Sequence, residues 1–235
     1  MKFKFSKKTK GNKYQGYFPA STGKEMAQFV DWIKNWSRLK VKNIFEIGAN
    51  FAQDADYLKE KFNVQPNNVY VFEAHPDIYN AIKKIHDFNA FNYAVYNTEK
   101  EITFNVLPID ASNTGLSSIL PLKNVATQEI KVQSIRIDKF MEKHNIKEID
   151  FLKLDVEGCN YEVLEGFGNR LKDVKSIHIE AEHTDFAYGN NKLFISIQSL
   201  LENNGFEMVY FQRYTSQSDS FWVQKEFIKN HRLES

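Results

Sequence analysis

From residue 41 onward, short apolar runs alternate with segments of helical periodicity, and this order of elements is what most constrains the fold. Strands that alternate with helices are typical of a doubly wound sheet in which most strands run parallel. We therefore predict an α/β fold of the Rossmann-like type, closed by an antiparallel pair at 206–211 and 220–224. The expected strands are 43–48, 68–73, 91–96, 101–107, 128–137, 149–154 and 176–182, and the expected helices are 52–62, 75–86, 138–145, 161–171 and 192–204.

Residues 1–40 are expected to form an extension that precedes this domain, which then covers residues 41–235. The first thirteen residues hold six lysines and no acidic residue, a pattern that fits either a solvated terminus or an anion-binding arm. Between residues 24 and 39, apolar residues recur at helical spacing. We therefore predict an N-terminal amphipathic helix with one face to bury.

The composition is that of an ordinary globular protein, with 42% hydrophobic and 26% charged residues. A formal net charge of +1 creates no chain-wide field for nucleic acid or an anionic membrane. The single cysteine, Cys159, excludes an internal disulfide and a cysteine-based metal cluster, which fits a reducing compartment. No run of about 18 apolar residues and no signal-peptide pattern is present, so a cytoplasmic protein without a membrane span is expected. A homo-oligomer is compatible with this composition and net charge.

The first expected strand ends in a turn that suits a bound ligand. In a doubly wound sheet, ligands bind beyond the carboxyl ends of the strands, near the point where the strand order reverses. Gly48 allows the backbone to turn sharply there, while Glu46 and Asn50 offer a carboxylate and an amide. The glycines of a dinucleotide-binding loop and the motif of a phosphate-binding loop are missing, which disfavours a nicotinamide oxidoreductase. A cofactor with a cationic centre and no phosphate fits better, and S-adenosylmethionine is the common cofactor of that kind.

An acidic residue ends the second expected strand. Glu73 follows Gly48 by 25 positions, close to the spacing of about 20 residues at which a carboxylate binds the ribose hydroxyls of a cofactor. Asn92 and Ala94, in the third expected strand, are placed to pass the adenine ring, and Phe51 lies where a ring could stack on it. These residues predict a cofactor site at one edge of the sheet.

Four segments together resemble the FkbM-type methyltransferases, a branch of the class I S-adenosylmethionine-dependent enzymes. They are FEIGAN, VYVFEAHP, NTGLSSI and above all IDFLKLDVEGCNYEVLEG, and the resemblance covers roughly residues 41–182. It implies the class I methyltransferase fold and methyl transfer to a hydroxyl, commonly of a sugar, glycan or polyketide. It also implies a cofactor site at Glu46, Gly48, Asn50 and Glu73, and a KxDxEG motif at the reaction site that contains Asp155 and Glu157. Ala74 and Asp155 are also expected to contact the cofactor.

The sequence departs from the family pattern at three places. Ala52 stands where the family usually has a second glycine, which would narrow the cofactor loop. Ala74 replaces the usual proline after Glu73, and Cys159 with Asn160 replaces the common Ala-Glu pair. None of these changes removes a charged group of the expected site.

The strands that end near residues 155 and 182 carry a dense set of polar side chains. Period-two alternation places Lys153 and Asp155 on one face of their strand. It places His178, Glu180 and Glu182 on one face of the later strand. Such groups are costly to bury unless they are paired, so their concentration indicates a reaction site.

A hydroxyl acceptor must be activated before it can attack a methyl group. A positioned base contributes about 10²–10⁴ in rate, and the candidates are Asp155, Glu157 and His183. A divalent cation such as Mg²⁺ would instead lower the pKa of the hydroxyl. Its oxygen ligands would be Asp155, Glu180 and Glu182. The sequence leaves both routes open.

Two polar loops on the cofactor side of the sheet are expected to bind the acceptor. Ser117 and Ser118 lie in one of them and Tyr188 in the other, and their hydroxyl and aromatic groups are of the kind that bind sugars. We therefore predict an S-adenosylmethionine-dependent O-methyltransferase acting on a sugar, a glycan or a related small molecule. The alternatives are an inactive binding module of the same fold and a nucleic-acid methyltransferase, which would prefer a basic channel.

Overall fold

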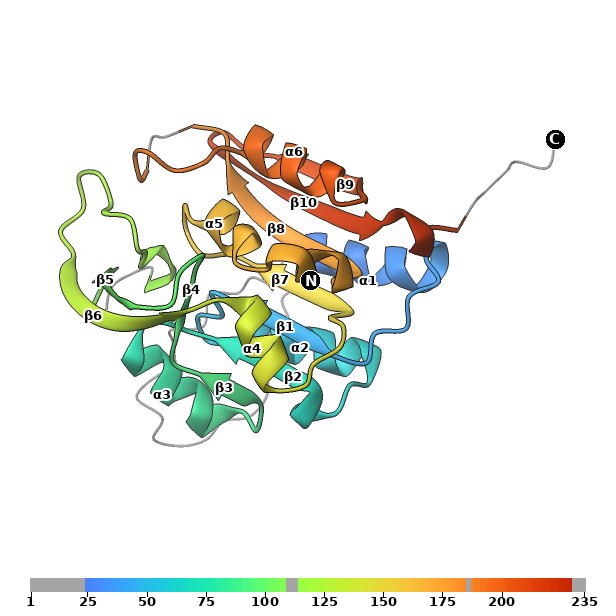
Figure 1. The fold of residues 1–235 in the computed structure, drawn as a ribbon, viewed down its shortest axis with the longest axis horizontal. Coiled ribbons are helices and arrows are strands. Elements are labelled where there is room, and N and C mark those ends of the chain that lie inside the picture. The colour runs from blue at the N-terminus through green and yellow to red at the C-terminus, as the bar shows by residue number, and fades with distance from the viewer. Residues whose placement is uncertain (1–23, 109–113, 185–186, 230–235) are drawn as a thin grey trace.

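The computed structural model describes residues 24–108, 114–184 and 187–229. The lysine-rich arm considered above lies outside these residues. Within them the chain forms a seven-stranded sheet and a smaller three-stranded sheet, with helices packed around the larger one (Figure 1). In the described ranges, no helix has both the length and the apolar character that crossing a membrane requires.

The main sheet has the strand order β3-β2-β1-β7-β8-β10-β9 (Figure 1). The five strands from β3 to β8 in this order run parallel, and β10 inserts antiparallel between β8 and β9. The predicted doubly wound, mostly parallel sheet with a closing antiparallel strand is therefore confirmed. The strands are β1 (Ile44–Ile47), β2 (Val69–Phe72), β3 (Asn89–Phe91), β7 (Phe151–Leu154), β8 (Ser176–Glu182), β9 (Phe206–Arg213) and β10 (Gln217–Gln224).

The smaller sheet interrupts the third expected strand. β3 ends at Phe91, and β4 (Ala94–Val95) leaves the main sheet to pair with β6 (Gln128–Ile135), which also pairs with β5 (Glu101–Val106). The prediction of one strand over residues 91–96 is therefore wrong. The side-chain amide of Asn92 donates to the carbonyl oxygens of Glu73 and Ala74 at 2.8 and 3.0 Å, which ties the chain to the end of β2 at this break.

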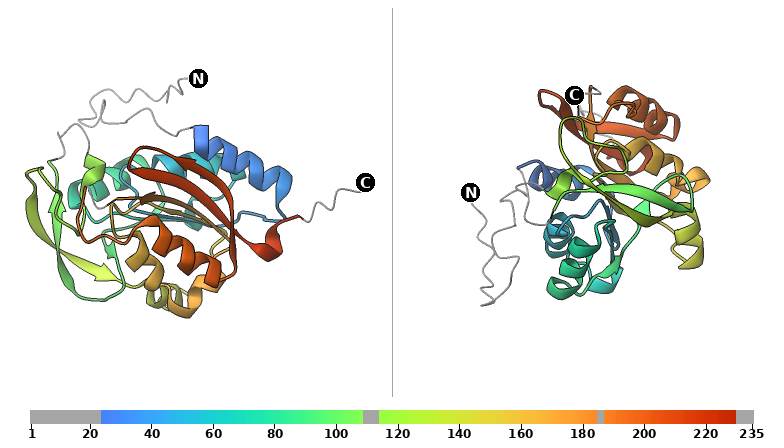
Figure 2. Two further views of the ribbon diagram at one scale, coloured as in Figure 1. Left: turned by 90° about the horizontal axis from the view of Figure 1, so that it is seen from above. Right: turned by 90° about the vertical axis from the view of Figure 1, so that its left-hand side faces the viewer.

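Helices cover both faces of the main sheet (Figure 2). Side chains alternate between these faces along each strand, so that Phe151 of β7 joins one apolar cluster and Leu152 joins the other. Because the parallel strands are buried on both faces of the sheet, their sequences are nearly continuous runs of apolar residues. One face packs against α1 (Lys24–Trp36), α2 (Gln53–Phe62) and α3 (Pro76–Ile85), and the other packs against α4 (Ile137–Lys143), α5 (Asn160–Glu165) and α6 (Phe194–Asn203).

The N-terminal helix contributes to this core. The ring of Phe29 in α1 is fully buried and stacks on Phe221 of β10, with 4.8 Å between the ring centroids. It also lies 4.7 Å from the ring of His178 in β8. The predicted amphipathic helix is present, and its apolar face covers the β8–β10 part of the sheet. The domain boundary expected at residue 40 stays a prediction.

Replacing Phe29 with alanine is expected to lower the free energy of unfolding by about 3–5 kcal/mol, because the lost ring leaves a cavity in a fully buried stack. Urea denaturation followed by circular dichroism measures this change. The control is Ile195→Ala in α6, where the side chain is 65% exposed and the expected change is below about 0.5 kcal/mol. Equal effects of the two substitutions would contradict the placement of α1 in the core.

Candidate functional site

A pocket opens beyond the carboxyl ends of β1, β2 and β7, where the strand order reverses. Its polar lining comes from Asn50, Glu73, Ser117 and Asp155, and the backbone of Gly48 forms part of its wall. Strand β5 of the smaller sheet and the segment between β5 and β6 close one side of the pocket with Phe104, Gly115, Ser117 and Ile119. The remaining lining is Ile47, Phe72, Ala74, Ile78, Tyr93, Ala94, Val95 and Val156.

Gly48 lies where the ends of three strands meet. It has a φ of +77°, in the left-handed region, and a Cβ atom there would lie 1.8 Å from the carbonyl oxygen of Asp155. The backbone N–H groups of Gly48 and Ala49 both donate to the carbonyl of Phe72 at 3.1 Å. A side chain at this position would therefore collide with the backbone that follows β7 and disturb the wall of the pocket.

Glu73 is held in one orientation at the end of β2. Its two carboxylate oxygens accept hydrogen bonds of 2.7 Å from the backbone N–H groups of Asn50 and His75. Burial raises the pKa of Glu73 to about 7. The carboxylate is thus fixed by main-chain donors at the edge of the pocket, as a group that binds the hydroxyls of a ligand needs to be.

Glu46 does not line this pocket. Its Oε2 atom accepts a 2.9 Å hydrogen bond from the backbone N–H of Ala55, in the first turn of α2. Ala52, which precedes that helix, has a left-handed backbone with a φ of 55° and makes no capping hydrogen bond with its side chain. Glu46 therefore acts as the cap of α2 from the neighbouring strand. Burial, followed by the charge of Asp54, raises the pKa of Glu46 well above its usual value.

Two other expected cofactor contacts also lie away from the pocket. The ring of Phe51 is buried in the apolar cluster shared by α1, α2 and α3, so the expectation that it stacks on a cofactor is corrected. Asn92 uses its amide to hold the backbone after β2. Ala74 and Ala94 do line the pocket, as does Asn50.

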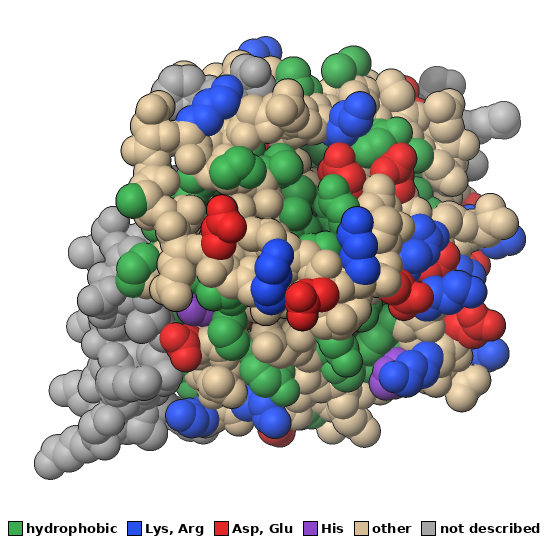
Figure 3. Space-filling model, turned by 60° about the vertical axis from the view of Figure 1, so that its left-hand side comes forward, with side chains coloured by type: hydrophobic (Ala, Val, Ile, Leu, Met, Phe, Trp, Pro, Cys, Tyr) green, Lys and Arg blue, Asp and Glu red, His purple; other side chains and the backbone are tan. Residues whose placement is uncertain are grey.

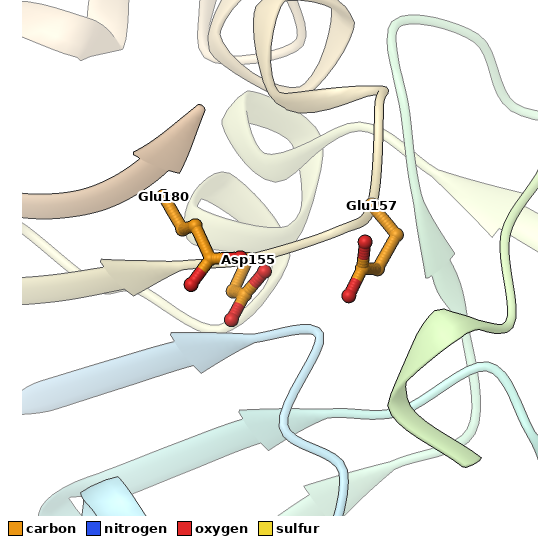
Figure 4. Close-up of side chains that lie close together, drawn as sticks. All are labelled: Asp155, Glu157 and Glu180. Atoms are coloured by element: carbon orange, nitrogen blue, oxygen red, sulfur yellow. The ribbon is translucent and has the colours of Figure 1, made fainter. Parts of the chain in front are cut away.

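Three carboxylates meet near the carboxyl ends of β7 and β8, two of them after β7 and the third within β8 (Figure 4). Asp155, Glu157 and Glu180 each place an oxygen within 4.8 Å of the others. The ammonium of Lys153, whose side chain is 6% exposed, donates to Asp155 at 2.9 Å. The amide of Gln217 donates to Glu180 at 2.5 Å. The charge of Asp155, together with burial, raises the pKa of Glu180 to about 9.

Glu157 is the most constrained member of this group. Its backbone has a φ of 52°, which is uncommon for a residue with a side chain. The phenolic O–H of Tyr188 donates to its carboxylate, and the hydroxyl of Ser118 donates to its carbonyl oxygen at 2.6 Å. Burial, followed by the charge of Asp155, raises the pKa of Glu157 to about 8.

These contacts change the expectation for the acceptor loops. Ser118 and Tyr188 are both buried and are engaged with Glu157, so they do not present free groups to an acceptor. Ser117 does line the pocket, and its hydroxyl accepts a 3.0 Å hydrogen bond from the backbone N–H of Leu107. Of the three residues expected to contact the substrate, the structure leaves Ser117 at the pocket.

His183 lies on the other side of the sheet from the carboxylates. Ile177, Ile179 and Ala181 face the α4–α6 side, and His183 continues this alternation. Its ring centroid is 5.0 Å from that of Phe194 in α6. Burial, followed by the charge of Arg213, lowers the pKa of His183. The structure therefore does not bring His183 to Asp155 and Glu157, as a shared role in catalysis would require.

The expected metal ligands are only partly brought together. Among the described residues, the cluster of possible ligands contains Asp155 and Glu180, but Glu157 takes the place expected for Glu182. Burial raises the pKa of Glu182 to about 7. Mg²⁺ requires near-octahedral oxygen coordination, whereas each carboxylate of the cluster already binds a lysine, a phenol or an amide. These contacts use one oxygen of each carboxylate, so the metal site stays a prediction.

Sequence reasoning missed the apolar wall that the smaller sheet adds to the pocket. Phe104 and Ile119 line the pocket from that side, and Tyr93 lines it from the break between β3 and β4. Phe104 lies in an alternating strand pattern, which indicates a buried residue but not the surface it covers. Only the path of the chain after β3 shows that this wall belongs to the pocket.

Comparison with known proteins gives two similarities beyond the site itself. The family model for the methyltransferase FkbM domain matches residues 46–208. Hexuronic acid methyltransferase AglP from Haloferax volcanii is 25% identical over 143 residues, which are 58% of this chain and 54% of that protein. The chain thus spans about half the length of this curated relative.

A solved structure shows the same fold. The crystal structure of methyltransferase FkbM from Methylobacillus flagellatus KT superposes with a TM-score of 0.50 and 11% sequence identity. The superposition covers 77% of this chain and 44% of that chain. At this identity, the likeness concerns the fold alone.

Proposed function

Because the chain belongs to the FkbM methyltransferase family, we propose that it transfers a methyl group from S-adenosylmethionine to a hydroxyl of a sugar or glycan. The observation that carries this proposal is the pocket at the strand ends, in which the fixed carboxylate of Glu73 shares the lining with Gly48 and Asp155. A nucleoside with a cationic side chain matches this combination of a hydroxyl-binding carboxylate, a close backbone turn and a second carboxylate.

Different residues of the pocket are suited to bind different parts of the cofactor. S-adenosylmethionine, when bound, supplies a methyl group on a positively charged sulfur. Glu73 is suited to accept hydrogen bonds from the two ribose hydroxyls. The apolar side chains of Ala94, Phe104 and Ile119 are suited to enclose the adenine. Asp155 offers negative charge to the cationic end of the cofactor.

Of the carboxylates at the reaction site, Glu157 is the better candidate for the base. Asp155 is engaged by the ammonium of Lys153 at 2.9 Å. Glu157 has a pKa raised to about 8 by burial, and a base works best when its pKa lies near the working pH. Tyr188 occupies one oxygen of the carboxylate, which leaves the other to take the proton of an acceptor hydroxyl.

The acceptor is proposed to be a sugar, and acidic sugars are the first class to test. The relative in Haloferax volcanii is named for hexuronic acid methylation. On the face seen in Figure 3, lysine and arginine side chains are interspersed with acidic and hydrophobic ones. Such a mixed surface supports a small acceptor over a nucleic acid, which would favour a continuous basic surface.

Calorimetry and a methyl-transfer assay test this function. We expect the purified protein to bind S-adenosylmethionine and its demethylated product but not NAD. We then expect transfer of labelled methyl from S-adenosylmethionine to hexuronic acids or neutral sugars, and none to RNA. Failure to bind either form of the cofactor would overturn the proposal, and binding without transfer to any acceptor would favour an inactive binding module. Loss of activity with EDTA and its return with Mg²⁺ would support the metal route.

The affinity for S-adenosylmethionine is expected to rise with pH through about 7. The ionised form of Glu73 accepts the ribose hydrogen bonds. Because its pKa is raised, Glu73 is mostly protonated at lower pH and must lose this proton when the cofactor binds. For a single group, the dissociation constant should then be about tenfold lower at pH 8 than at pH 6. Calorimetry at several pH values measures this dependence.

Two glutamine variants distinguish Glu73 from its neighbours. Glu73→Gln should bind the cofactor more weakly and without the rise between pH 6 and pH 8. Glu182→Gln is the control, because burial also raises the pKa of Glu182 to about 7 although this residue does not line the pocket. Loss of the pH dependence in the Glu182 variant and its retention in the Glu73 variant would contradict the assignment.

A further inference from the structure

We propose that Tyr188 and Ser118 are positioning residues that together hold Glu157 in the geometry of the base, an inference that rests on the proposed methyl transfer. Neither residue would touch the acceptor. Each would act through Glu157, one on its carboxylate and the other on its backbone. This role replaces the substrate contacts expected for both residues from the sequence.

Tyr188 holds the side chain of Glu157. Its phenolic O–H donates to one carboxylate oxygen of Glu157, and its side chain is almost completely buried. The ring packs against Gly158, where an added Cβ would lie 3.0 Å from two ring atoms of Tyr188. Because the ring is fixed by packing, the hydroxyl is directed at one place, and the carboxylate is limited to one orientation.

Ser118 holds the backbone of Glu157. Its hydroxyl donates to the carbonyl oxygen of Glu157 at 2.6 Å and accepts from the backbone N–H of Leu120 at 3.0 Å. Its own N–H and carbonyl pair with Asn105 in β5 at 3.0 and 2.8 Å. Glu157 needs such support because its φ of 52° lies in the left-handed region, which costs free energy for a residue with a side chain.

The two residues come from segments that are distant in sequence and are linked to each other. Ser118 belongs to the segment that follows β5, and Tyr188 belongs to the segment that follows β8. The backbone N–H of Lys123 donates to the carbonyl of Ala187 at 2.9 Å, which joins the two segments next to Tyr188. Glu157 is therefore clamped between two connected loops that are distant in sequence. Reacting groups must be placed within a fraction of an ångström for efficient catalysis, and the clamp provides that placement.

The experiment is a set of conservative variants assayed with S-adenosylmethionine and the best acceptor. Tyr188→Phe keeps the ring packing on Gly158 and removes only the hydroxyl. We expect kcat to fall by about tenfold or more, as for the loss of a hydrogen bond to a charged group. The KM for the acceptor and the dissociation constant of the cofactor should stay within about twofold, since neither ligand loses a contact. Ser118→Ala should likewise lower kcat and leave the KM for the acceptor nearly unchanged.

Controls and a second readout separate positioning from simple loss of structure. Tyr79→Phe on α3 and Ser199→Ala on α6 remove the same groups away from the site and should leave kcat unchanged. Combined with Glu157→Gln, Tyr188→Phe should lower kcat by less than about twofold further, because a residue that acts through Glu157 has nothing left to position.

Each other outcome overturns the inference. A raised acceptor KM with unchanged kcat in Tyr188→Phe would restore Tyr188 as a substrate contact. An unchanged kcat in both Tyr188→Phe and Ser118→Ala would show that Glu157 needs no clamp. If the reductions in kcat caused by Tyr188→Phe and by Glu157→Gln multiply in the double variant, the two residues act independently. If the wild-type protein binds no cofactor or transfers no methyl group, the proposed function itself fails, and the inference fails with it.

Discussion

Replacing Gly48 with alanine is expected to weaken the binding of S-adenosylmethionine by more than about 100-fold, as measured by calorimetry, and to lower the free energy of unfolding by at least about 3 kcal/mol. A Cβ atom would lie 1.8 Å from the carbonyl oxygen of Asp155, which is far inside contact distance. The neighbour in this collision is backbone, so no side-chain rotation can relieve it. The end of β1 must move away from β7, and the wall of the cofactor pocket moves with it.

The strain of the backbone adds to this collision. Gly48 has a φ of +77°, and a left-handed conformation costs a residue with a side chain about 1–2 kcal/mol. Ala52→Gly is the matched control in the same loop, because Ala52 already bears a left-handed backbone with a φ of 55°. That variant should bind the cofactor within about threefold of the wild type. A Gly48→Ala protein that binds the cofactor normally would contradict the proposed position of the site.

Replacing Glu157 with glutamine is expected to lower kcat by about 10²–10⁴, the usual contribution of a general base. Glutamine preserves the size of the side chain and can still accept a hydrogen bond from Tyr188, but it cannot take the proton of the acceptor hydroxyl. The dissociation constant of S-adenosylmethionine should change by less than about threefold, because Glu157 does not line the cofactor pocket. Single-turnover methyl transfer and calorimetry measure the two quantities.

The pH dependence of the wild-type rate gives a second check on Glu157. Burial raises its pKa to about 8, and only the ionised form can act as a base, so kcat should rise with pH up to about that value. Glu142→Gln on α4, where the side chain is 72% exposed, is the matched control and should leave the rate unchanged. A normal kcat in the Glu157→Gln protein would show that Asp155 or another group is the base.

Much of the fold could be predicted because the signals for it are local. The apolar runs at β1, β2, β7 and β8 and the helical periodicity between them determine the doubly wound sheet. The break between β3 and β4 was not predicted, because the run over residues 91–96 has strand character throughout. At that break, the amide of Asn92 binds carbonyl oxygens 18 and 19 positions away, a contact between segments that no local pattern indicates.

The candidate site was predictable to the extent that strand direction and alternation determine it. Gly48, Glu73 and Asp155 follow three parallel strands, and the structure places all three around one pocket. Glu46 was expected to contact the cofactor, but its carboxylate caps α2 by accepting a hydrogen bond from the backbone N–H of Ala55. The two residues are nine positions apart, and the turn after β1 brings them together. His183 directly follows Glu182, the last residue of β8, yet the pleat directs it to the other face of the sheet.

By itself, the sequence determined the order of strands and helices, the family resemblance and the edge of the sheet at which the pocket lies. These properties follow from periodicity and strand direction, which neighbouring residues carry. Only the tertiary structure decided which polar groups share the same space. Ser118 and Tyr188 lie 39 and 31 positions from Glu157, and they reach it because two loops pack together over the end of β7. Such contacts depend on the packing of distant segments, so no local pattern in the sequence specifies them.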